Sequence, residues 1–170
     1  MYRLLWPLWG LFFHWEIFTG PRLVPARVSR VLDGDTVVLA SGRHVRLAGV
    51  DAPELGQPTR SPQKDAGVFA RRCLEHILAP SKRQVRIRIQ GQDIYRRTLG
   101  ALFLPDGTAV DEELLVRGCA VVYRYGRGER RALLRLEAEA KKKRQGLWRL
   151  GGIMDPGAYR RKLRRRGAGR

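Results

Sequence analysis

Apolar and polar residues alternate along five short segments of the chain, the period of strands with one buried face. In the stretch QVRIRIQ, Val85, Ile87 and Ile89 share one face while the arginines share the other. Turn residues such as those of the Ser41-Gly42 pair separate the segments. Five strands in meander order with glycine-marked turns predict a small barrel, closed or partly open. The five segments are 24–32, 36–40, 43–50, 84–90 and 99–104.

Apolar residues at helical spacing predict about three helices in the second half of the chain. The first covers 64–79 and stops at Pro80, and the others cover 110–117 and 129–145, each followed by glycine. Strands followed by interspersed helices indicate one α+β domain, which we place at residues 22–149.

The two ends differ from this central part. Residues 1–21 form an apolar segment with three of the four tryptophans, and its apolar run Leu4–Phe13 has signal-peptide length and is too short to span a bilayer. A signal or signal-anchor segment, an interfacial anchor and a misplaced start codon all stay open, and membrane attachment through this segment with them. Residues 150–170 hold seven basic residues against one acid, which predicts a disordered basic tail.

The charge balance is unusual, with 34 Lys+Arg against 16 Asp+Glu and a formal net charge of +18. Because the excess is not confined to the tail, the folded part itself should be electropositive. Such a protein suits a polyanionic partner, either nucleic acid or an anionic membrane surface, or a purely structural basic role.

Cys73 and Cys119 are the only cysteines, and neither a CxxC nor a paired histidine spacing is present, which argues against a zinc site. We expect two buried thiols. A disulfide stays open, since the sequence does not show whether the two residues approach each other.

The stretch VLDGDTVVLASGRHVRLAGVDAPE gathers four carboxylates in this basic protein, namely Asp33, Asp35, Asp51 and Glu54. If its two strands pair as a hairpin, their far ends meet and bring Asp35 beside Asp51. Two carboxylates held together repel each other unless a cation lies between them, and oxygen ligands alone favour Ca²⁺ or Mg²⁺. Asp33 is expected to form the turn or to lie outside the first ligand shell.

The motifs DGDT, VRLAGVDAPE and YRR, with LLVRG, VVYRY and GLW downstream, resemble the staphylococcal nuclease (thermonuclease) family. The match runs in order over about residues 24–148, and the pairing of D-x-D-T with R-x-x-x-x-D-x-P-E is its specific part. The resemblance implies an OB-fold five-stranded barrel with about three helices, one bound Ca²⁺, and hydrolysis of DNA or RNA phosphodiesters with little sequence specificity.

Carried over residue by residue, the resemblance implies that Asp35 and Asp51 are calcium carboxylates and that Ala52 adds its backbone carbonyl. Glu54 matches the carboxylate that positions or deprotonates the attacking water, and both roles stay open. Arg46 matches one phosphate-binding arginine of the family.

The second catalytic arginine matches Arg97 in YRRTLG. The family usually reads Tyr-Gly-Arg here, so Arg96 stands at the glycine position and a shift of one residue stays open. Tyr123 and Tyr125 match a Tyr-x-Tyr pair that would pack on a bound nucleotide, with core aromatics as the alternative. Tyr95 is the third candidate for substrate binding.

We therefore expect a monomeric Ca²⁺-dependent phosphodiester hydrolase of the endonuclease type. The alternative is a nuclease-fold module that only binds nucleic acid, but such a module should have lost one of the five acidic and arginine side chains. A membrane-surface protein would explain the ends of the chain but not the acids. A nonspecific nuclease free in the cytoplasm would be hazardous, which favours export or membrane attachment.

Overall fold

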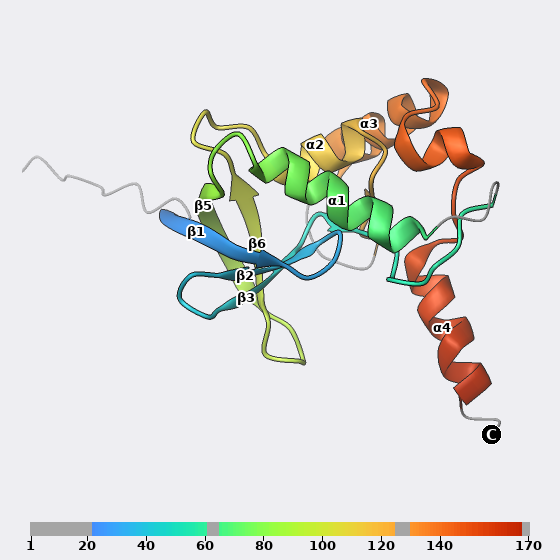
Figure 1. The fold of residues 1–170 in the computed structure, drawn as a ribbon, viewed down its shortest axis with the longest axis horizontal. Coiled ribbons are helices and arrows are strands. Elements are labelled where there is room, and N and C mark those ends of the chain that lie inside the picture. The colour runs from blue at the N-terminus through green and yellow to red at the C-terminus, as the bar shows by residue number, and fades with distance from the viewer. Residues whose placement is uncertain (1–21, 61–64, 125–129, 168–170) are drawn as a thin grey trace, which may run out of the picture.

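The computed structural model describes residues 22–60, 65–124 and 130–167. The strands are β1 (Leu23–Val31), β2 (Thr36–Leu39), β3 (His44–Leu47), β4 (Val50–Asp51), β5 (Gln84–Gln92), β6 (Thr98–Phe103) and β7 (Val121–Val122). The helices are α1 (Ala66–Leu78), α2 (Val110–Val116), α3 (Arg131–Lys142), the 3-10 helix η1 (Gly146–Leu150) and α4 (Pro156–Gly167). Five of the strands close into a barrel, and α1, α2 and α3 lie on one side of it (Figure 1).

The expected α+β barrel is confirmed, but its strand order is not a meander. The order is β1-β2-β3-β6-β5, with β3 and β6 parallel, and β4 pairs separately with β7. The long connection through α1 lets the β5–β6 hairpin return so that β5 pairs with β1 and β6 with β3. This closure leaves no free edge in the barrel and sets β6, which follows the predicted arginine loop, beside β3.

The barrel interior is filled by the alternating apolar residues that predicted the strands. Val37, Val45 and Leu102 are fully buried within it, and α1 covers one opening with Leu74 and Leu78. A closely packed core of branched aliphatic side chains holds the strand ends in fixed positions. The carboxylates of the stretch 31–54 lie at or next to these strand ends.

Cys73 of α1 and Cys119, which follows α2, form a disulfide, so the expectation of buried free thiols is wrong. Their Cα atoms lie 6.3 Å apart, within the usual range for a disulfide. The bond ties α1 to the segment that leads into β7.

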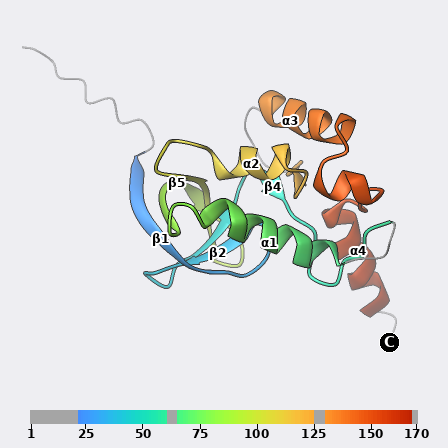
Figure 2. The same ribbon diagram turned by 45° about the horizontal axis from the view of Figure 1, so that its top comes forward.

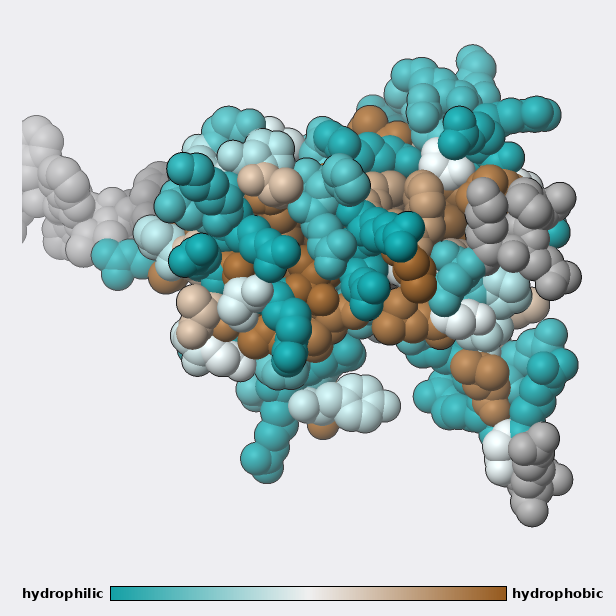
Figure 3. Space-filling model, in the orientation of Figure 1, coloured by the Kyte–Doolittle hydropathy of each residue, from teal (hydrophilic) through white to brown (hydrophobic). Residues whose placement is uncertain are grey.

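The expectation of a disordered tail is wrong for residues 156–167, which form α4. Asp155 caps the helix by accepting a hydrogen bond from the Ala158 N–H at 2.9 Å, and Pro156 occupies the first helical position. The preceding chain is docked by Gln57, whose Nε2 donates to the Met154 carbonyl at 2.7 Å. Helix α4 extends away from the barrel (Figure 2), and its surface is largely hydrophilic (Figure 3).

The other predictions about the chain ends stay open. Residues 1–21 lie outside the described residues, and the boundary at residues 22–149 remains a prediction. None of the helices in the described ranges is long and apolar enough to cross a membrane.

Candidate active site

The turn between β1 and β2 brings the first carboxylates to the end of the barrel. Asp33 accepts a hydrogen bond from the Asp35 N–H at 3.0 Å, so it shapes the turn, as expected. Gly34 packs so closely that a Cβ there would lie 2.6 Å from the Cβ of Ala52. Asp35 in turn accepts a hydrogen bond from the Ala52 N–H at 2.6 Å, and it is only 6% exposed. The predicted pairing of β2 with β3 is confirmed, and it carries Asp35 to the end of β4.

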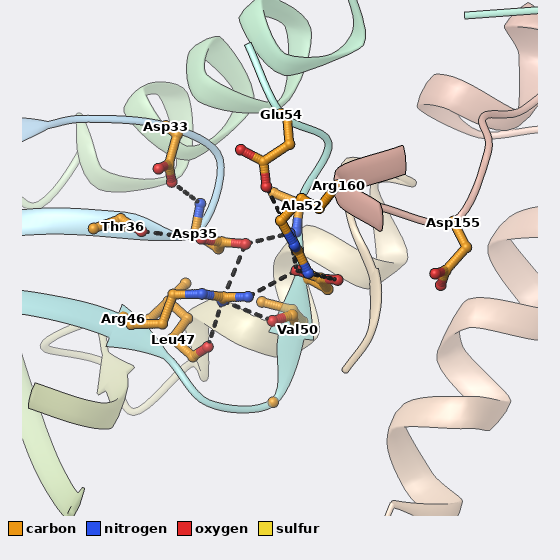
Figure 4. A network of polar contacts seen from close by, with 12 residues as sticks. Asp33, Asp35, Thr36, Arg46, Leu47, Val50, Ala52, Glu54, Asp155 and Arg160 are labelled. Carbon is orange, nitrogen blue, oxygen red and sulfur yellow. Dashed lines mark hydrogen bonds and ion pairs between the residues drawn. The ribbon is translucent and has the colours of Figure 1, made fainter. Parts of the chain in front are cut away.

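Arg46 points towards Asp35 (Figure 4), and its guanidinium contacts both predicted calcium carboxylates. Its Nη1 is 3.0 Å from Oδ2 of Asp35, and its Nη2 donates to Oδ1 of Asp51 at 2.8 Å. The same guanidinium donates to the carbonyls of Leu47 and Val50 at 2.8 and 2.9 Å. One buried guanidinium thus separates two carboxylates that would otherwise repel each other at short range.

Arg46 does not fully compensate the burial of Asp35. Burial raises the pKa of Asp35 to about 7, with further upward contributions from Asp33 and Asp51. The Arg46 charge and the Ala52 N–H act in the opposite direction. The floor of the site therefore favours additional positive charge.

Glu54 follows β4 on a loop that α1 holds in place. A Cβ on Gly67 would lie 2.2 Å from the Glu54 carbonyl oxygen, so glycine allows the helix to start directly against this loop. The side chain of Glu54 is 39% exposed and accepts a hydrogen bond from Nη1 of Arg160 at 2.6 Å. Arg160 also donates to Oδ2 of Asp51 at 2.8 Å. The sequence analysis missed Arg160, and only the Asp-Pro helix start before it was a local signal.

Arg97 lies on the β5–β6 hairpin, on the other side of the site. Asp93 organises this turn, since it accepts hydrogen bonds from the N–H groups of Tyr95 and Arg97, both at 2.9 Å. It also accepts from Nε of Arg97 at 2.7 Å. Desolvation opposes the charge of Asp93, but these hydrogen bonds from Arg97 lower its pKa overall. Asp93 is a second residue that the sequence analysis missed, and its signal was an Asp at the start of a turn.

The unusual Arg96 adopts a φ of 61°, the left-handed backbone that glycine takes at little cost. The turn therefore keeps the shape expected for a glycine, with an arginine in its place. Arg97 lines both the central cleft and a shallower neighbouring groove, whereas Arg96 lines the groove but not the cleft. This placement agrees with the choice of Arg97 over Arg96.

A cleft of about 980 Å³ connects the two sides of the site. The guanidinium carbons of Arg97 and Arg46 lie 5.6 and 5.7 Å from the rings of Tyr95 and Tyr123, respectively. Tyr125 lies outside the described residues. The predicted site residues that line the cleft are Asp35, Arg46, Ala52, Glu54, Tyr95, Arg97 and Tyr123.

Asp111 of α2 supports the turn between Arg46 and Asp51 from behind. Its Oδ2 accepts a hydrogen bond from the Gly49 N–H at 3.0 Å, while its buried Oδ1 has no hydrogen-bond partner among the described residues. Burial raises the pKa of Asp111 to about 6. Nothing in the sequence distinguished Asp111 from a solvent-facing acid at the start of a helix.

Comparison with known proteins places this arrangement in a family. The family model described as "Staphylococcal nuclease homologue" matches residues 44–150, which contain both arginines, Asp51 and Glu54. The chain belongs to the staphylococcal nuclease family. The resemblance seen in the motifs is thereby confirmed, and the protein is a nuclease of the staphylococcal type, a hydrolase that acts on nucleic acid.

Relatives of this nuclease include proteins that match over most of both chains. An "Uncharacterized endonuclease" of Escherichia coli O157:H7 is 30% identical over 157 residues, which cover 91% of this chain and 95% of the relative. The "Micrococcal nuclease" of Shigella flexneri is 31% identical over 160 residues, covering 86% and 83%. The "Probable endonuclease LCL3" of Komagataella phaffii is 34% identical over 129 residues; the match covers 69% of this chain and about half, 54%, of that protein.

The donor atoms of this nuclease fit a hard divalent cation in chemical type. Asp35 and Asp51 offer carboxylate oxygens, Ala52 offers a carbonyl, and calcium and magnesium prefer such oxygen ligands. Within the described ranges, no three His, Cys, Asp or Glu side chains already form a cluster suited to a metal. The guanidiniums of Arg46 and Arg160 contact these acids instead.

Proposed function

We propose that this protein is a Ca²⁺-dependent nuclease that hydrolyses phosphodiester bonds of DNA or RNA with little sequence preference. The observation that carries the proposal is the pair of buried carboxylates, Asp35 and Asp51, on either side of Arg46. Asp35 and Arg46 line a cleft that also exposes Glu54 and Arg97. Acids to hold a cation and arginines to hold a phosphate are the two sets of groups that such a reaction needs.

Asp35, Asp51 and the Ala52 carbonyl would hold the cation. When bound, a divalent cation neutralises charge on a phosphoryl oxygen and lowers the pKa of a nearby water. The pKa of Asp35, near 7, supports this assignment, because a buried acid with too little compensating charge gains from a cation beside it.

Arg46 and Arg97 would stabilise the phosphate in different ways. Arg97, with a third of its side chain exposed, is free to turn its planar guanidinium towards a phosphate oxygen while Asp93 holds its Nε. Arg46 is fixed by four acceptors, so it acts as a preorganised charge at the floor of the cleft.

Glu54 is the acid best placed to meet the attacking water. Its side chain is more exposed than those of Asp35 and Asp51, and it lies on the loop directly after Asp51. The water oxygen forms a bond to phosphorus while Glu54 orders this water or takes its proton. The bond from phosphorus to the sugar oxygen breaks, and the leaving oxygen takes a proton from solvent water.

Substrate binding needs no base-specific contact. Tyr95 and Tyr123 line the cleft, and stacking of a base on an aromatic ring tolerates every sequence. The net charge of +18 attracts a polyanion at long range.

The test is cleavage of single-stranded DNA, duplex DNA and RNA with Ca²⁺, with Mg²⁺ and with a chelator. We expect cleavage with Ca²⁺ that the chelator abolishes, and a large loss of rate for Glu54→Gln with nucleic-acid binding retained. Binding without cleavage above the chelator control would instead identify a nuclease-fold module that only binds. Undiminished cleavage by Glu54→Gln would remove Glu54 from the reaction.

A further inference from the structure

Arg160 makes the closest polar contacts that α4 has with the site. Its Nη1 donates to Glu54 Oε1 at 2.6 Å, and its Nη2 donates to Asp51 Oδ2 at 2.8 Å. The same two nitrogens of Arg160 also donate to Oδ1 of Asp51, each at 3.2 Å. Hydrogen bonds to Asp51 and Glu54 raise the pKa of Arg160 even though burial opposes its charge. One guanidinium therefore holds a predicted cation ligand and the predicted water-binding acid together.

The contacts that place Arg160 lie at the start of α4. Tyr159 donates its hydroxyl to the Gly56 carbonyl at 3.3 Å, and Pro156 and Gly157 are buried. From residue 161 onward the helix is exposed. Arg160 is thus the last position of α4 that is partly buried, and its ion pairs contribute directly to holding the helix against the site.

Arg160 and a divalent cation would compete for the same atoms. A calcium ion binds carboxylate oxygens at about 2.3–2.6 Å, so it needs the lone pairs of Asp51 that Arg160 and Arg46 now occupy. Arg46 also donates to two backbone carbonyls, whereas the hydrogen bonds of the Arg160 guanidinium among the described residues go to the two acids. Two positive centres a few ångströms apart repel strongly in a partly buried site, so the less constrained one gives way.

We propose that Arg160 is a positioning residue that acts as an internal counter-cation: it holds Asp51 and Glu54 while no divalent cation is bound, and the cation displaces it. The inference rests on the proposed calcium site. It adds that occupation of this site is coupled to α4, and that the wild-type affinity for calcium is lowered by competition with this side chain.

The experiment is calorimetric titration of Ca²⁺ into the full-length protein without nucleic acid, at constant ionic strength. We compare the wild type with Arg160→Gln and with Arg165→Gln, a matched loss of charge on the same helix but outside the cleft lining. Arg160→Gln should bind Ca²⁺ about tenfold more tightly, as expected for removing a competing charge-assisted hydrogen bond. Arg165→Gln should stay within about twofold of the wild type, because an exposed charge is screened.

The outcomes separate the two proposals. If all three proteins bind Ca²⁺ alike, or if Arg160→Gln binds more weakly, Arg160 does not compete and the inference is overturned while the calcium site stands. If none of them binds Ca²⁺, the proposed cation site fails and the inference fails with it.

Hydrogen exchange of the wild type gives a second test that needs no variant. Addition of Ca²⁺ should speed amide exchange in α4 while α1 keeps its protection, because displaced Arg160 no longer holds the helix. Unchanged exchange in α4 at saturating Ca²⁺ would contradict the proposal.

Discussion

Two arginines face the same cleft, but the regions that hold them are built differently. Arg46 lies in what we term the buried wall, formed by β3, β4 and the β1–β2 turn; its side chain is 11% exposed and contacts two buried acids. Arg97 lies in the hairpin wall, formed by the β5–β6 turn; its side chain is 33% exposed and pairs with Asp93 four residues before it.

The difference shows how fold and function are coupled in this protein. In the buried wall, the charges that serve the site also compensate one another inside the core, so function and stability depend on the same contacts. In the hairpin wall, a local turn presents the functional group to solvent, so it can change with little effect on stability.

The largest expected difference between the two walls is the loss of stability when the arginine of each wall is replaced by glutamine. The comparison is made at pH 8, where Asp35 is ionised. Arg46→Gln leaves buried Asp35 without its arginine and Asp51 with Arg160 alone, and it should lower the free energy of unfolding by about 3–5 kcal/mol. Arg97→Gln removes a local, partly exposed pair and should cost less than about 1 kcal/mol. Both should slow cleavage by about 10²–10³-fold. Urea unfolding and initial cleavage rates measure the two effects, and equal losses of stability would remove the distinction between the walls.

A change in stability of intermediate size is expected at Asp111, which lies behind the buried wall. Its pKa rises from 3.8 to about 6 on folding, so the folded state favours the protonated form. The stabilising contribution of this proton is complete below about pH 4 and is lost as the pH rises through 6. Asp111→Asn should therefore gain about 2 kcal/mol of stability relative to the wild type between pH 4 and pH 7.

Unfolding in urea across this pH range measures the gain at Asp111. Glu112→Gln, an exposed acid on the same helix, is the matched control and should show no comparable trend. A stability difference for Asp111→Asn that stays flat with pH would contradict the buried, raised-pKa carboxyl.

The smallest effect is expected in the hairpin wall, at Arg96. Its φ of 61° disfavours any residue with a Cβ, so Arg96→Gly should be more stable than Arg96→Ala by about 1 kcal/mol. Both variants lose the same charge, and only glycine removes the strain. Thermal unfolding compares them; a more stable alanine variant would show that the turn does not impose this backbone conformation.

Much of the buried wall was predictable because local patterns determine it. The alternation in 36–40 and 43–50, with Ser41-Gly42 between them, specified the hairpin that brings Asp35 to Asp51. Helices α1, α2 and α3 were predictable from the spacing of their apolar residues and from the proline or glycine that follows each predicted helix. The pairing of β3 with β6 was not predictable in this way, because it depends on a closure that joins distant segments.

Arg160 shows why the remainder of the site was missed. It lies 106 residues after Glu54, in a segment whose charge suggested disorder. The cap at Asp155 and the docking of Met154 on Gln57 stabilise the start of α4, and the two acids compensate the Arg160 charge. These stabilising contacts come from the rest of the fold, so the composition of the tail alone gave the wrong prediction.

The central claim is that the buried wall, and not the hairpin wall, binds the cation. The most direct measurement is the Ca²⁺ dissociation constant at pH 8 of the wild type, Asp35→Asn and Arg97→Gln, each checked for folding by circular dichroism. We predict that Asp35→Asn weakens Ca²⁺ binding by about 100-fold or more and that Arg97→Gln stays within about twofold of the wild type. Wild-type affinity in Asp35→Asn, or an equal loss in Arg97→Gln, would contradict this account.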